Sequence, residues 1–140
     1  GVEGRIEMFE SDYNIQGKHE THVKYLASEV KINGNTLFER YIDVYMNAAI
    51  FGLLYNRTAQ RDSSSDRARI YADAFASCRN DCTFLYRLVM LLEQTTDITP
   101  EERIDRAFRH DADETKKDKV EENMSLFHAY VLGGIEVLYE

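Results

Sequence analysis

Two histidines, His19 and His22, stand three residues apart in a segment with helical spacing. Residues three apart share one face of a helix, and two imidazoles on such a face can hold a metal ion. The dipeptide His110-Asp111 could add a nitrogen and an oxygen ligand if the two segments meet. The candidate metal set of a small metal-dependent hydrolase is therefore His19, His22, His110 and Asp111. The simpler interpretation, which we favour, is that these histidines lie on the surface.

Three arginines recur at every third position, at Arg103, Arg106 and Arg109. Guanidinium groups match the geometry of phosphate, so this cluster is a candidate nucleic-acid-binding site. Glu101 and Asp105 alternate with the arginines, which is typical of a solvated helix face held by ion pairs. We prefer the solvated face. A second arginine group flanks a serine-rich loop and has the same two interpretations: Arg57, Arg61, Arg67 and Arg69.

Cys78 and Cys82 are the two cysteines of the chain. A zinc clip usually has two residues between its cysteines and a second pair elsewhere, whereas three residues separate this pair. We therefore expect reduced thiols packed in the core. The sequence also lacks a serine–histidine–aspartate spacing, a phosphate-cradling loop, a nucleotide fingerprint and a zinc-protease motif. These features favour a non-enzymatic protein without a cofactor.

The charge is acidic and unevenly distributed. The formal net charge is −8, and residues 1–70 hold 9 basic and 10 acidic side chains, whereas residues 71–140 hold 8 and 15. This balance lacks the basic footprint of a duplex-DNA-binding protein. The longest apolar stretch, residues 48–55, is far shorter than the ~20 residues that span a bilayer. We expect a cytoplasmic protein without a membrane partner.

The apolar pattern predicts helices. A length of 140 residues fits one domain, and seven glycines are few for a β-sandwich. Apolar residues recur at spacings of three and four, which predicts an all-α compact bundle of five to six helices. We expect residues 1–18 to form an irregular arm. The expected helices after it are 20–30, 36–57, 66–77, 81–95, 100–109 and 118–139.

Local signals suggest where helices begin. Thr36 with Glu39, and Thr99 with Glu102, have the spacing of capping boxes. Asn33-Gly34 could turn a hairpin. Its flanking segments are short and polar, so we expect a loop instead.

Residues 48–55 are apolar on every side, which is typical of a helix in the interior. We therefore expect helix 36–57 to be central. Three small residues, Ala48, Ala49 and Gly52, would let a neighbouring helix approach closely.

The last helix is the strongest candidate for an interaction surface. Its apolar face, which includes Val131, Gly134 and Leu138, is wider than one neighbouring helix needs. A symmetric dimer would bury the surplus against a second copy. The competing interpretation is the outer wall of a monomeric bundle. We expect a non-enzymatic interaction or accessory module that associates with itself or with another protein.

Overall fold

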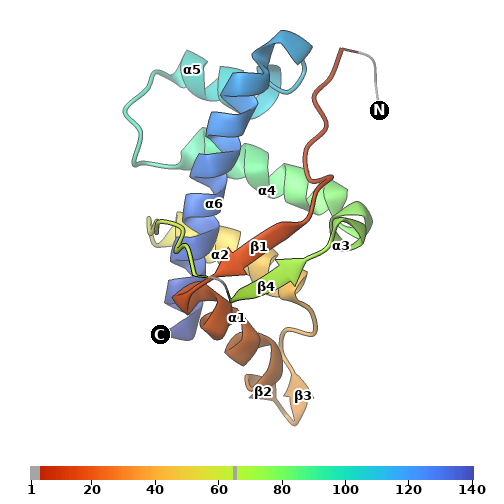
Figure 1. Cartoon of the computed structure of the whole chain (residues 1–140). Coiled ribbons are helices and arrows are strands. Elements are labelled where there is room, and N and C mark those ends of the chain that lie inside the picture. The colour runs from red at the N-terminus through yellow and green to blue at the C-terminus, as the bar shows by residue number, and fades with distance from the viewer. Residues whose placement is uncertain (1–3, 65) are drawn as a thin grey trace.

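Two long helices, α2 (Tyr41–Leu54) and α6 (Lys117–Tyr139), form the most extensive packing contact of the chain that the structure describes. The computed structural model describes residues 4–64 and 66–140. Helix α1 (Lys18–Ser28) packs against the C-terminal half of α6. Helix α4 (Arg79–Leu92) crosses α6 (Figure 1). The described residues include no helix that is both long and apolar enough to cross a membrane.

The contact between α2 and α6 is made at backbone level. A Cβ atom added to Gly134 would overlap the carbonyl oxygen of Ala48, and one added to Gly52 would overlap that of Tyr130. Ala48 and Ala49 of α2 are fully buried. The small residues of α2 thus allow close approach, as the sequence predicts, and glycine in α6 completes the fit.

The chain is mainly helical, as the sequence predicts, and it also contains two short antiparallel sheets that the expected all-α bundle does not include. Strand β1 (Tyr13–Gln16) pairs with β4 (Arg67–Ile70), with Tyr13 opposite Ile70 and Gln16 opposite Arg67. In β4 the arginines are exposed, whereas Ala68 and Ile70 are buried. This alternation has the period of a strand, and it falls inside the helix predicted over 66–77.

A small hairpin joins α1 to α2. Strands β2 (Lys31–Ile32) and β3 (Asn35–Thr36) pair around Asn33 and Gly34, whose φ angles are 53° and 82°. Two consecutive positive φ angles at Asn-Gly are typical of a tight hairpin turn. The expectation of a loop at these residues is therefore wrong. Because Thr36 belongs to β3, helix α2 begins five residues later than predicted, at Tyr41.

The remaining helices are short. They are α3 (Ala72–Ser77), α5 (Pro100–Ile104), the π-helical turn η1 (Asp105–Arg109) and the 3₁₀ turn η2 (Glu114–Lys116). The capping box at the start of α5 is confirmed, because the backbone N–H of Glu102 donates to Thr99 Oγ1 at 3.1 Å. The predicted helix 100–109 thus changes to π geometry at Asp105, where the carbonyl accepts from the N–H of His110 at 2.9 Å.

Candidate functional site

The predicted histidine pair lies on α1, beside the C-terminal part of α6. His19 is buried, and its Nε2 is 2.8 Å from Oε2 of Glu136. His22 stacks on the ring of Tyr139, with ring centroids 3.8 Å apart. Among the described residues, neither buried Nδ1 atom has a hydrogen-bond partner. A metal ion held here would need Glu136 as a third ligand.

Glu136 already belongs to a network of cations. Its carboxylate lies 3.1 Å from Lys18 Nζ and 3.0 Å from an Arg57 nitrogen, in addition to its bond to His19. Burial raises the pKa of Glu136, but hydrogen bonds from His19, Lys18 and Arg57 outweigh burial and lower it to about 2. Two fixed positive charges beside the carboxylate would repel a metal cation. The arrangement instead joins α1 and the segment that follows α2 to α6.

His110 and Asp111 lie at the other end of α6. Asp111 is buried and accepts two hydrogen bonds from Arg87, both of 2.9 Å. His110 Nδ1 is 3.1 Å from the side-chain nitrogen of Asn123. Positions 123 and 136 are separated by about 20 Å along an α-helix. The structure therefore does not bring the two halves of the predicted metal set together. No group of three or more His, Cys, Asp or Glu residues in 4–64 and 66–140 could hold a metal ion.

The predicted arginine cluster is occupied by partners within the chain. Arg106 is buried and donates to Glu93 Oε1 at 2.7 Å and to the carbonyl of Met90 at 2.8 Å. Arg103 donates to the carbonyls of Glu93 and Thr96 at 2.6 and 3.0 Å. These bonds fix the chain between α4 and α5. Two of the three arginines therefore hold the fold together.

The third arginine, Arg109, is exposed and lies 2.5 Å from Glu101 and 2.8 Å from Asp105. This is the solvated face with ion pairs that the sequence indicates. Of the three arginines, it alone presents its guanidinium largely to solvent, and two carboxylates already flank it.

Glu93 is the centre of the buried polar network at the end of α4. It is fully buried and accepts a hydrogen bond from the hydroxyl of Tyr130 at 2.8 Å. Burial raises the pKa of Glu93, but hydrogen bonds from Arg106, Thr95 and other groups lower it to about 2. The same Tyr130 hydroxyl is 3.3 Å from Asn56 Oδ1. The C-terminal ends of α2 and α4 therefore meet at Tyr130.

The residues predicted as an interface lie mostly inside the chain. Val131 and Gly134 are buried, and Gly134 faces the backbone of Ala48. Leu138 is half-buried and packs against the core.

The thiol of Cys82 is buried, and burial raises its pKa to about 12. Such a thiol is a packing group with little thiolate at neutral pH.

The surplus apolar surface lies on α2 and α4 instead. Ile50 and Leu54 of α2 are 44% and 71% exposed, and Leu92 of α4 is 55% exposed. These two helices contact each other, and their ends meet at Tyr130. Other apolar side chains of the two helices are half-buried. We group the exposed and half-buried aliphatic side chains of these two helices as the α2–α4 apolar face and define it by Met46, Ile50, Leu53, Leu54, Leu88 and Leu92.

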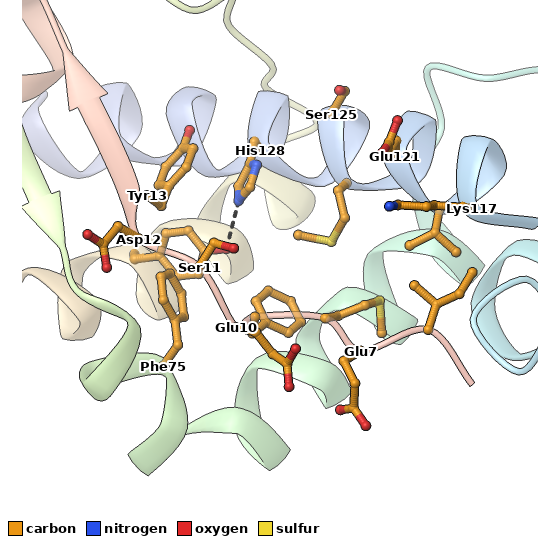
Figure 2. A pocket seen from close by; sticks show the side chains of 16 residues that line it. Glu7, Glu10, Ser11, Asp12, Tyr13, Phe75, Lys117, Glu121, Ser125 and His128 are labelled. Carbon is orange, nitrogen blue, oxygen red and sulfur yellow. Dashed lines mark hydrogen bonds between the residues drawn. The ribbon is translucent and has the colours of Figure 1, made fainter. Parts of the chain in front are cut away.

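A cleft lies between α6 and the extended residues 6–13 (Figure 2). Its volume is about 460 Å³. Phe9 forms part of its floor with a φ of 61°, which is uncommon for an aromatic residue, and its ring packs 5.9 Å from the ring of Phe127. The buried Phe9 side chain thus anchors one wall of the cleft to the core.

One end of the cleft is closed by three ring side chains. His128 of α6 stacks on Tyr13, with centroids 4.0 Å apart, and its Nε2 is 2.9 Å from the hydroxyl of Tyr45. The dashed line in Figure 2 marks this hydrogen bond. Burial, with a smaller contribution from Arg61, lowers the pKa of His128 to about 3. The imidazole is therefore neutral at physiological pH.

The sequence does not identify this cleft, because its two walls are more than a hundred residues apart along the chain. One signal was present. His128 interrupts the apolar stripe of α6, one turn after Met124 and three residues before Val131. A polar side chain on an apolar helix face requires a partner inside the fold, and here that partner is Tyr45.

Comparisons of the chain with protein-family models, curated proteins and solved structures find no match.

Proposed function

We propose that this chain is a non-enzymatic interaction module that self-associates through the α2–α4 apolar face. The observation that carries the proposal is the exposure of large aliphatic side chains on neighbouring helices, led by Leu54 at 71%. Apolar surface gains free energy when it leaves water, by roughly 25 cal/mol per Å². A cluster of such side chains around one helix pair is typical of an interaction site.

The charge pattern supports a second copy as the occupant. The chain carries a net charge of −8, so two copies repel each other over most of their surface. Residues 44–56, which include the whole α2 part of the face, have no charged side chain. A two-fold contact places the same patch on both partners, and an uncharged apolar patch is complementary to itself. This face therefore lets two acidic chains meet with little direct charge repulsion.

The alternative functions use residues that have other partners in the fold. In a nucleic-acid site, the guanidinium groups of Arg103, Arg106 and Arg109 would have to leave their present partners. These partners are Glu93, Glu101 and backbone carbonyl groups. A hydrolytic metal site would need His19 and His22 to meet His110 and Asp111. The two pairs lie beside opposite ends of α6. No contact in the described residues favours either function over self-association.

Sedimentation velocity at micromolar concentration tests the proposal. The wild-type chain should sediment as a dimer, and Leu54→Glu should weaken the dimer by about 100-fold or more, because a two-fold contact would bury two unpaired carboxylates. Leu37→Glu is the matched control. Leu37 is also an exposed leucine, but it lies next to the β2–β3 hairpin and outside the face. This variant should remain a dimer.

Two results would overturn the proposal. One is a wild-type chain that stays monomeric over the whole concentration range. The other is a dimer that Leu54→Glu leaves intact and Leu138→Glu dissociates, which would place the contact on α6. Circular dichroism of each variant should match the wild type, which separates loss of association from loss of folding.

A further inference from the structure

The cleft between residues 6–13 and α6 has the size and lining of a small-molecule site. Ligand pockets occupy roughly 300–1,000 Å³, and this cleft has a volume of about 460 Å³. Its inner lining is mostly apolar, with Met8 on one wall, Val120 and Met124 on the other, and the rings of Tyr45 and Phe75 between them. Methionine side chains adapt to irregular apolar shapes and contact aromatic rings well. The interior therefore suits a compact apolar or aromatic body.

The rim of the cleft is acidic. Four carboxylate residues and one lysine line the opening: Glu7, Glu10, Asp12, Glu121 and Lys117. In Figure 2, Glu10 and Glu121 stand on opposite walls, the first on the extended segment and the second on α6. A cleft bordered by one sign of charge concentrates the opposite charge near its mouth. The rim therefore attracts cations and repels anions.

The ring side chains at the aromatic end of the cleft carry no positive charge, although Arg61 lies close enough to lower the pKa values of His128 and Tyr13. His128 borders the cleft beside Tyr13, and its hydrogen bond to Tyr45 holds the ring in place. Because burial lowers the pKa of His128 to about 3, the imidazole stays neutral at physiological pH. The half-buried ring of Tyr13, which lines this end, can also attract an organic cation.

We propose that this cleft binds a small organic amine, with the apolar body between Met8 and Met124 and the ammonium group at the acidic rim of the opening. The apolar lining selects against a bare metal ion or a polyamine without an apolar body. The acidic rim selects against fatty acids and other amphipathic anions. This site is separate from the α2–α4 apolar face, so it does not depend on self-association.

The methionines allow a direct test by NMR of the full chain labelled at the methionine methyl carbons. Of four methionines, Met8 and Met124 line the cleft, whereas Met46 and Met90 do not. Titration with 2-naphthylmethylamine should shift the Met8 and Met124 signals in a saturable way and leave the other two in place. The matched anion, 2-naphthoate, has the same ring and should bind at least about tenfold more weakly.

Charge variants test the role of the rim. Replacing both Glu10 and Glu121 with glutamine should weaken binding of the naphthylamine by about three- to tenfold, because exposed ion pairs contribute modestly. Glu122→Gln is the control, because Glu122 is adjacent to Glu121 but lies outside the cleft. It should leave binding unchanged.

Three results would overturn the proposal. They are equal affinity for the amine and the anion, shifts of equal size at all four methionines, and no saturable shift of Met8 or Met124. Self-association would perturb Met46, which belongs to the α2–α4 apolar face. The experiment therefore distinguishes a failure of amine binding in the cleft from a failure of self-association.

Discussion

Both sides of α2 are hydrophobic, but one side is buried within the chain and the other side carries exposed residues. The inner side carries Ala48, Ala49 and Gly52, and it packs so closely on α6 that backbone meets backbone at Gly134. The outer side carries larger aliphatic residues, and Leu54 remains 71% exposed. Hydrophobicity alone thus does not decide which side of a helix is buried within its own chain. The small residues mark the side that a neighbouring helix can approach.

The largest effect should come from adding one methyl group on the inner side. Replacing glycine with alanine inside a helix normally stabilises a protein by about 0.5–1 kcal/mol. At Gly134 the added Cβ would overlap the carbonyl of Ala48, so we expect Gly134→Ala to lower the free energy of unfolding by about 3 kcal/mol. Urea denaturation measures this change. A variant more stable than the wild type would show that the two helices are not in backbone contact.

The inner side should also carry a pH dependence that the outer side lacks. Tyr45 of α2 bonds to His128, whose imidazole stays neutral down to about pH 3 in the folded chain and takes up a proton near its ordinary pKa of 6.5 when unfolded. The unfolded state binds more protons between these values, so the free energy of unfolding falls as the pH falls from 6.5 toward 3.

His128→Gln keeps a hydrogen-bonding group but removes this titration. We expect the decline in stability between pH 6.5 and 4.5 to become shallower by at most about 1.4 kcal/mol per pH unit. His22 and His110 also have lowered pKa values, so part of the decline remains. Urea titrations at several pH values measure the slope. An unchanged slope would contradict the buried neutral imidazole.

The smallest effect on folding should come from the outer side. Leu54→Ser removes an exposed aliphatic side chain that makes few contacts in its own chain. We expect a change within about 0.5 kcal/mol in the free energy of unfolding, measured at a concentration where the chain is monomeric. A loss of several kcal/mol would mean that Leu54 is part of the core and that the outer side of α2 is not open.

The sequence predicts the helices well and the strands poorly, for a physical reason. Helix spacing is local, so α4, α6 and the capped start of α5 were recognisable within a few turns of chain. Strand β4 is four residues long and pairs with β1, more than fifty residues earlier, so the sequence near β4 does not contain its partner. Short strands of this kind are stabilised by tertiary contacts, which a local pattern does not show.

The candidate sites divide in the same way. Asp111 and Arg106 were noted for their chemistry, but whether such a group is free depends on what the fold places beside it. In the fold, Asp111 is paired with Arg87, and Arg106 is paired with Glu93. The cleft and the α2–α4 apolar face both join elements that are distant in sequence. Only the interruption at His128 and the apolar excess of residues 48–55 pointed toward them.

The most direct test of the account is an isotope-filtered NOE experiment on a mixture of labelled and unlabelled wild-type chains. This experiment detects only contacts between copies. We predict NOEs between chains at the methyl groups of Ile50, Leu54 and Leu92, all on the α2–α4 apolar face. Intermolecular NOEs at Leu138 without any at Leu54, or no intermolecular NOEs at concentrations well above micromolar, would contradict it.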